Sequence, residues 1–309
     1  MLNNITGILS TMFSMSIPLI LAALGGVYSV RSGIMALGLE SMILTGAFTA
    51  AVGSFYSGSA WIGLLCGILG GMIFGLCHGL LCIRYKVNQV ISGIGLNLLA
   101  TAASTLLMQI IWGNKGNSEA VASVNTKLTF LKDVPVLGDI FSRQSVLLIF
   151  TILVCIASWF ILFKTPFGLR MRSCGEFPQA SASMGINVRR MRYFGVLVSG
   201  ALAGLAGGVM VLTQDVQFTV VTVHGFGFIA IAALIFGKWN PFGVLGAGMF
   251  FGFSQTLGFY AKDIPFLATL PTEFFSMFPY VLTIIALVIF AGKSVGPKAS
   301  GEIYDTGKR

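Results

Sequence analysis

Apolar runs without a charged residue recur along almost the whole chain, separated by short polar segments. Nine such runs occur, at residues 5–30, 41–54, 61–83, 87–112, 144–163, 193–214, 216–237, 239–261 and 274–292. About twenty apolar residues let an α-helix cross the roughly 30 Å hydrocarbon core of a membrane, where lipid cannot pair with backbone amides. The pattern therefore predicts an all-α polytopic transmembrane bundle of about nine spans, with eight to ten left open because the 41–54 run is short.

The run at 216–237 is the least regular of the nine. Polar side chains, among them Gln217 and His224, fill its first half, and strongly apolar residues begin only at Phe228. Irregular backbone is tolerated at membrane depth where it faces protein or a water-filled cavity. We count this run as a span with an irregular beginning, because omitting it would place the basic residues near the C-terminus on the opposite side.

The composition excludes a soluble domain. The net charge is therefore best interpreted as a sign of which loops lie in the cytoplasm. The chain has 309 residues, is 56% hydrophobic and 9% charged, has a mean hydropathy of +0.90 and carries a formal charge of +9. In a soluble protein that charge would suggest nucleic acid as a partner, which the apolar composition argues against. We predict no nucleic-acid partner.

Loop charges predict the orientation. If alternate loops share a side, one set holds all but five of the 19 Lys and Arg residues; the exceptions are Lys115, Lys127, Lys132, Arg143 and Lys262. The positive-inside rule places the basic set in the cytoplasm, with the N-terminus outside and the C-terminus inside. Residues 1–309 then form a single membrane domain with an extracellular loop at 113–143 and a cytoplasmic loop at 164–192.

Small residues at helical spacing predict close helix packing. Glycine recurs at every fourth position in one run (Gly63, Gly67, Gly71, Gly75 and Gly79) and again in another (Gly200, Gly204 and Gly208). Such faces let helix backbones approach closely within a membrane, where lipid supplies no hydrophobic drive. We expect another helix to lie in each groove, and a sliding surface stays open as an alternative to plain packing.

A polar stripe marks the 87–112 run. The stripe consists of Gln89, Asn97, Thr101 and Ser104, with Gly93 at the same helical spacing. Polar groups at membrane depth usually face protein or water, so two interpretations stand side by side. Either the stripe lines a solute pathway, with Asn97 the strongest candidate for touching a polar solute, or it makes interhelical hydrogen bonds worth about 1 kcal/mol or less per pair.

Catalytic and metal chemistry find no support in the residues. The cysteines show no CxxC spacing, and no nucleophile, base and orienting group form a recognisable set. We predict no catalytic residue, no metal site and no enzyme. No run contains an acidic residue, and Glu40 and Asp215 stand at run boundaries, which disfavours a proton- or sodium-coupled carrier because such carriers commonly use intramembrane carboxylates.

The loop at 164–192 has the pattern of a docking segment. Pro178 can start a short helix and Gly185 can end it, with small residues between them and Glu176 near the positive N-terminal end. Basic residues on both sides are ordinary signals of a cytoplasmic location. We predict a short helix that docks into a groove on a cytoplasmic partner.

This loop resembles the coupling loop of permease subunits of bacterial ABC importers of the branched-chain amino acid, ribose and nucleoside type. Their pattern is close to G-x-x-x-R-A-x-G-x-x-P-x-A-A-x-x-x-G-I. The chain matches it at Gly168, Arg172, Gly175, Pro178, Ala180, Gly185 and Ile186, and departs from it at Ser173 and Ser181.

Two further stretches look like the nucleoside branch of this family, whose binding subunit is a lipoprotein. Residues 31–48, RSGIMALGLESMILTGAF, are similar to its R-S-G-x-x-N-I-G-L-E-G-M-x-L-x-G-A-F, and residues 227–241, GFIAIAALIFGKWNP, resemble its G-F-I-A-L-A-A-L-I-F-G-K-W-N-P. Ala36, Ser41, Phe177 and Phe226 stand where this branch usually has Asn, Gly, His and Arg. The changes at Ala36 and Phe226 bear on the solute more than on the mechanism.

The resemblance implies an ABC importer permease fold in the bacterial cell membrane and a set of partners. These are a second, related permease, an extracellular lipoprotein that binds nucleoside, and a cytoplasmic ATPase that binds ATP and Mg, so the chain itself needs no cofactor. It implies coupling to the ATPase through Arg172, Gly175, Glu176, Pro178, Ala180 and Gly185. A ribose-like sugar or a branched-chain amino acid as cargo and a stand-alone secondary carrier are the alternatives.

Overall fold

The computed structural model describes residues 2–124, 146–223, 225–260 and 296–305, together with Met277, Val281, Ile284 and Ile285. Within these ranges the chain forms helices and no β-strand, only a single bridge between Asn117 and Thr219. The all-α fold predicted from the apolar runs is confirmed. The helices in chain order are α1 (Leu2–Arg31), α2 (Leu39–Ser57), α3 (Ala60–Gly79), the π-helical η1 (Leu80–Arg84), α4 (Gln89–Trp112), α6 (Val146–Lys164), α7 (Pro166–Glu176), α8 (Pro178–Ser183), α9 (Val188–Val209), the π-helical η3 (Met210–Asp215), the 3-10 turn η4 (Val221–Val223), α10 (Phe226–Phe236) and α11 (Pro241–Tyr260).

Six of these helical stretches are long and apolar enough to cross a membrane. They are Thr6–Arg31, Ala60–Arg84, Gln89–Trp112, Val146–Lys164, Val188–Asp215 and Pro241–Tyr260. The run at 216–237 begins irregularly, as expected, and its helix α10 has only 11 residues, about 17 Å at 1.5 Å per residue. The predicted span at 274–292 lies almost entirely outside the described residues.

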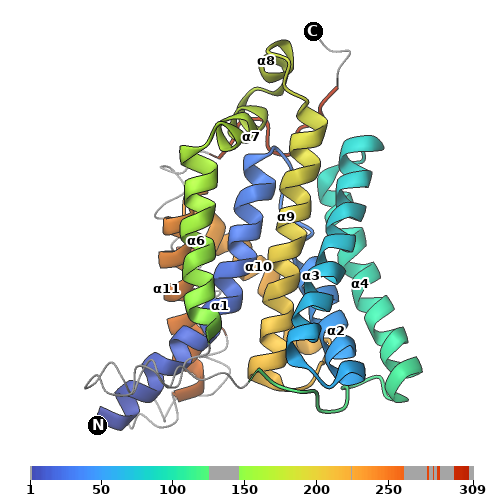
Figure 1. The fold of residues 1–309 in the computed structure, drawn as a ribbon, viewed down its shortest axis with the longest axis vertical. Coiled ribbons are helices and arrows are strands. Elements are labelled where there is room, and N and C mark those ends of the chain that lie inside the picture. Colours follow the sequence, from blue (N-terminus) through green and yellow to red (C-terminus); the bar gives the residue numbers. More distant parts are fainter. Residues whose placement is uncertain are drawn as a thin grey trace.

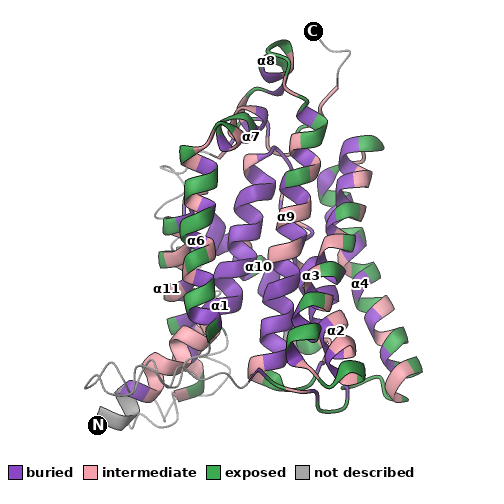
Figure 2. Ribbon diagram, viewed as in Figure 1, coloured by how far each residue is buried: buried purple, intermediate pink, exposed green. Residues whose placement is uncertain are grey.

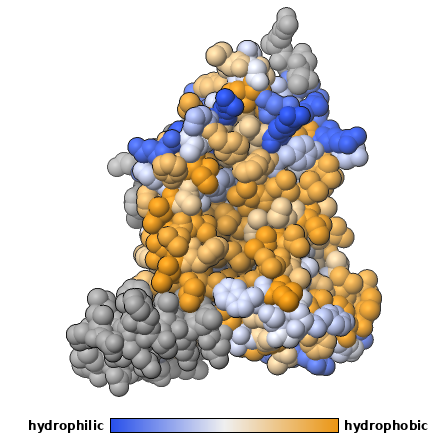
Figure 3. Space-filling view, in the orientation of Figure 1, coloured by the Kyte–Doolittle hydropathy of each residue, from blue (hydrophilic) through white to orange (hydrophobic). Residues whose placement is uncertain are grey.

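The bundle has one strongly basic end. Helices α7 and α8 project beyond the spans at the end where the C-terminus also lies, and the N-terminus lies at the other end (Figure 1). Hydrophilic residues gather at the α7/α8 end, above a broad apolar band on the face in view (Figure 3). We call the α7/α8 end, which includes Arg31, Lys86 and Arg192, the basic end.

Side chains that accept from free backbone amides begin several helices at the basic end. Asn88 accepts from the amide of Val90 at 2.8 Å at the start of α4, and Asn187 accepts from that of Arg190 at 3.1 Å at the start of α9. Pro166 occupies the first turn of α7 after the cap residue Thr165. Local sequence therefore fixes where these helices start.

Glycine contacts join α2, α3 and α9 through their backbones. A Cβ atom on Gly71 of α3 would stand 2.5 Å from the Cα of Gly204, and Gly200 packs on the same glycine of α3. Gly46 of α2 also packs against Gly204. The prediction that other helices lie in the glycine grooves is confirmed, with α9 in the groove of α3 and α2 against both.

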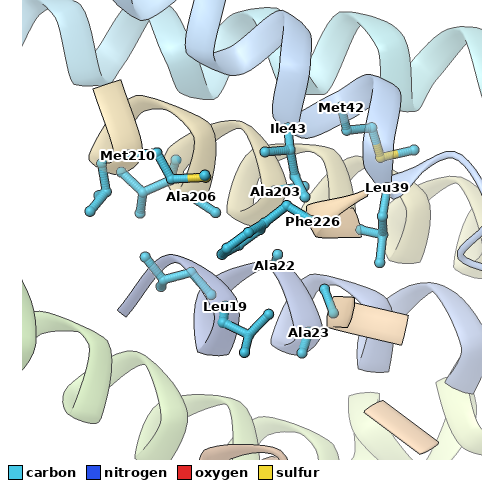
Figure 4. Close-up of a cluster of buried hydrophobic side chains, with 14 of the residues drawn as sticks. Leu19, Ala22, Ala23, Leu39, Met42, Ile43, Ala203, Ala206, Met210 and Phe226 are labelled. Carbon is cyan, nitrogen blue, oxygen red and sulfur yellow. The ribbon is translucent and has the colours of Figure 1, made fainter. Parts of the chain in front are cut away.

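The apolar core lies where α1, α2, α9 and α10 meet. These central helices are buried along most of their length, whereas α4 and α6 expose much of their surface (Figure 2). Phe226, the first residue of α10, lies among Ala22 of α1, Ile43 of α2 and Ala203 of α9 (Figure 4). The start of the short helix is thereby fixed inside the bundle.

Candidate functional site

A largely buried non-helical segment connects α1 to α2. Residues 32–38 leave the end of α1 and turn back into the bundle before α2 begins at Leu39. Leu39 and Leu234 both pack on Gly26, which lies within α1 rather than at its end. Because irregular backbone in a membrane needs partners from protein or enclosed water, the partners of this segment define a candidate site.

Polar side chains of α3 and α4 hydrogen-bond the backbone of this segment. The Met35 amide donates to Oε1 of Gln89 at 2.7 Å, and its carbonyl lies 3.3 Å from Nε2 of His78. Nδ2 of Asn97 donates to the Leu37 carbonyl at 3.4 Å. The segment is therefore fastened by two neighbouring helices that are distant from it in sequence.

Asn97 also completes the start of α2. Its Oδ1 accepts from the Ser41 amide at 3.0 Å, at a position where an α-helix has amides without helical partners. One amide side chain thus bonds the last turn of the irregular segment and the first turn of the helix. Gln89 and Asn97, both predicted pathway residues, are brought together on residues 32–41.

The four predicted pathway residues do not share one environment. Gln89 and Ser104 are buried, Asn97 is half-buried and Thr101 is exposed, with its hydroxyl donating to the Asn97 carbonyl in its own helix. Nε2 of Gln89 is buried without a hydrogen-bond partner among the residues that the structure describes. Gln89 and Asn97 therefore hold the backbone of residues 32–41 against α4. A role of the stripe in contacting solute stays a prediction.

Glu40 joins the starts of the two helices that begin inside the bundle. Its Oε1 accepts from the Gly225 amide and its Oε2 from the Gly227 amide, each at 2.6 Å. These amides belong to the N-terminal end of α10, where the helix dipole favours a negative group. The first turn of α2 is thereby tied to the first turn of α10.

The glycines around Glu40 are required by this geometry. Gly225 has φ of +83°, in the left-handed region that favours glycine. A Cβ on Gly227 would stand 2.6 Å from the Glu40 amide nitrogen and 2.7 Å from its Cα, so no larger residue fits. The Gly-x-Gly sequence at the start of α10 therefore allows the Glu40 carboxylate to approach the backbone closely.

The partners of Glu40 could not be predicted from its place at the boundary of an apolar run. Its carboxylate binds the first turn of α10, because residues 32–38 turn back before α2 begins. An acidic residue in a first helical turn, with a distant Gly-x-Gly as its partner, was the available signal.

The predicted docking helix forms where the sequence places it. Helix α8 starts at Pro178 and ends at Ser183, and Gly185 follows with φ of +80°. Pro178 is buried, whereas Ala180 and Gly185 are exposed. The flanking Phe177 is 57% exposed and Met184 is 83% exposed, so the helix presents apolar side chains beyond the basic end.

The other predicted coupling residues face inward. Arg172 of α7 stacks its guanidinium 4.7 Å from the ring centroid of Phe163. Gly175 is buried against the Arg31 carbonyl, and Oε2 of Glu176 accepts from the Lys298 amide at 3.3 Å. Burial raises the pKa of the Cys174 thiol, which favours its neutral form. These residues hold the loop in place, and the contact from Lys298 was not foreseen.

No group of three or more His, Cys, Asp or Glu side chains that could hold a metal ion occurs among the described residues. The free cysteines are Cys66, Cys77, Cys82, Cys155 and Cys174.

Comparisons with known proteins match nearly the whole chain. Residues 8–287 match the family described as branched-chain amino acid transport system / permease component. A guanosine ABC transporter permease protein of Bacillus subtilis is 45% identical over 94% of each chain, and a nucleoside ABC transporter permease protein of Lactococcus lactis is 40% identical over 98% of each. A putative glucose ABC transporter permease protein of Haloferax volcanii is 30% identical over 91% of this chain and 90% of its own.

No solved structure matches the chain. The sequence match, the helical bundle and the apolar spans agree with one another, and the resemblance drawn from the loop motifs is confirmed. The chain belongs to the branched-chain amino acid transport system permease family, whose members are multi-span membrane proteins.

Proposed function

We propose that this chain is the permease subunit of an ATP-driven importer that carries nucleosides into the cell. The observation that carries the proposal is the similarity, over 94% or more of each chain, to permeases named for guanosine and for nucleosides. The chain lies in the bacterial cell membrane with its basic end in the cytoplasm, its N-terminus outside and its C-terminus inside. The positive-inside rule supports this orientation.

The work of transport is divided between this chain and its partners. A cytoplasmic ATPase binds ATP and Mg, a second related permease completes the membrane core, and an extracellular lipoprotein delivers the nucleoside. Helix α8, with exposed Phe177 and Met184 at its ends, docks on the ATPase. ATP-driven closure of the ATPases moves α8 and changes which side of the membrane the pathway opens to.

The solute route passes the starts of α2 and α10, which Glu40 ties together. Gln89, Asn97, Thr101 and Ser104 line it, in keeping with the rule that transporter sites form where discontinuous helices meet. The buried Nε2 of Gln89, unpaired among the described residues, supports the route because a donor in that state costs free energy unless a partner arrives.

Replacing Asn97 with leucine is expected to lower the initial rate of nucleoside uptake by about tenfold. Leucine leaves the Ser41 amide and the Leu37 carbonyl without this partner, and an unsatisfied polar group costs roughly 1–3 kcal/mol. Gln109→Leu, which changes an exposed amide on the same helix, is the matched control and should leave uptake unchanged. Uptake is measured in vesicles and normalised to the amount of folded complex. Wild-type uptake kinetics in Asn97→Leu would show that the stripe only packs against other helices and does not line the solute route.

A simple sugar is the second candidate cargo, because one relative is named as a putative glucose permease. Uptake of labelled guanosine by the full complex in proteoliposomes, in competition with nucleosides, ribose, glucose and leucine, separates these classes. We expect ATP-dependent uptake that only nucleosides inhibit. Competition by sugar or leucine alone would move the proposal to that cargo, and accumulation without ATPase subunits would favour a secondary carrier.

A further inference from the structure

The segment Gly296–Asp305 crosses the basic end of the bundle, and we call it the strap. In Figure 1 it is the red trace near α7 and α9. It contains no described helix, yet Ala299 in its middle is 2% exposed. A non-helical segment that is buried at its centre must be held by the elements around it.

The strap bonds the last residues of α7, directly before α8. The Ala299 amide donates to the Gly175 carbonyl at 2.9 Å, and the neighbouring Lys298 amide donates to Glu176. Nζ of Lys298 lies 5.2 Å from the ring centroid of Phe177, a cation–π contact. Consecutive residues at the end of α7 are therefore held by two consecutive residues of the strap.

The other half of the strap is anchored to the membrane helices. Nη1 of Arg192 donates to the Glu302 carbonyl at 3.0 Å, and its guanidinium lies 5.7 Å from the ring of Tyr304. Arg192 is 1% exposed, so a buried cation of α9 fixes this half. Nζ of Lys86 adds an ion pair to Asp305 at 2.8 Å, which is solvent-exposed and therefore weak.

Between these two anchors the strap touches the irregular segment at residues 32–38. A Cβ on Gly301 would meet the end of the Met35 side chain at 3.0 Å, and Gly301 has φ of +87°. The backbone of Met35 is the one held by Gln89 and His78. A single residue, Ser300, thus separates the contact of Ala299 with the end of α7 from the contact of Gly301 with the segment that leads into α2.

We propose that the strap positions the docking helix α8 and carries its displacement to the irregular segment at residues 32–38. This inference rests on the proposed function, in which α8 docks on an ATPase. Movement of α8 pulls on Gly175 and Glu176, the strap moves with them, and Gly301 transmits the movement to Met35. Lys298, Ala299 and Gly301 are positioning residues, because in this proposal they touch neither nucleotide nor nucleoside.

Ala299→Pro tests the proposal, because proline removes the amide hydrogen that Gly175 accepts. Ile303→Ala is the control, since it shortens a side chain of the same segment that is 47% exposed and leaves the backbone amide in place. Both are measured in the full complex, as guanosine molecules imported per ATP hydrolysed. Loss of one such hydrogen bond should lower this ratio about five- to tenfold in Ala299→Pro, and Ile303→Ala should leave it unchanged.

The ratio distinguishes positioning from a general loss of folded protein, which lowers import and hydrolysis together. Loss of ATPase binding by a monodisperse Ala299→Pro permease would also support the proposal. An unchanged ratio in Ala299→Pro would overturn the proposal. If Ala299→Pro does not fold, the chain is truncated after Pro297, and an unchanged ratio in that variant would overturn the proposal in the same way. Absence of ATP-dependent guanosine import by the wild-type complex would instead overturn the proposed function.

Discussion

Gly204→Val should abolish accumulation of the folded permease. A Cβ at this position would stand 2.9 Å from the Cα of Gly71 and 3.0 Å from its nitrogen, and would also meet the Gly67 carbonyl. These are backbone atoms, so no side chain can rotate away. Overpacking a core with one or two methyl groups typically costs about 1–3 kcal/mol, and a clash between backbones should cost more.

The matched control is Gly246→Val in α11, where a Cβ would meet nothing within 4 Å. Both variants are compared by the amount of monodisperse protein extracted from membranes and by its thermal unfolding. We expect Gly246→Val to behave as the wild type. Extraction of Gly204→Val at wild-type yield and stability would show that α3 and α9 can separate, contrary to the packing described.

Glu40→Leu should remove transport while the complex still assembles. Leucine leaves the amides of Gly225 and Gly227 without their carboxylate, and each hydrogen bond to a charged group contributes about 1.5–3 kcal/mol. The starts of α2 and α10 then lose their shared tie. We expect nucleoside uptake at background level in Glu40→Leu. We expect a partial loss in Glu40→Gln, whose single amide oxygen can replace only one of the two acceptor oxygens.

Glu119→Gln is the control for charge, because Glu119 is exposed on the segment after α4. Uptake in proteoliposomes and ATP hydrolysis are measured on the same preparations. Wild-type uptake by Glu40→Leu would contradict a functional tie between the two helix starts. Loss of both assembly and uptake would reduce Glu40 to a stability role.

Features encoded by neighbouring residues could be predicted from the sequence. The docking helix follows from Pro178 and Gly185, which set its two ends within a few positions. The contact between α3 and α9 follows from glycine at every fourth residue, because this spacing leaves one helix face without side chains. In both cases the signal lies in residues that are close together in the sequence.

Features that depend on distant partners could not be predicted. Glu40 and Gly225 are 185 positions apart, and Lys298 and Glu176 are 122 apart. Hydrophobic periodicity reports which face of a helix is buried but not which loop backbone meets it. For the same reason Gln89 and Asn97 could be placed on one helix from the sequence, while their bonds to Met35 and Ser41 could not.

The glycine seam between α3 and α9 has a mechanical consequence. Where two helices touch through side chains, a change of rotamer lets one slip past the other. At Gly71 and Gly204 no side chains separate the two backbones. We therefore expect α2, α3 and α9 to move together as one rigid unit. The movements of the transport cycle would then be made by the elements around these three helices. The first candidate is the short helix α10, whose first turn Glu40 bonds to α2.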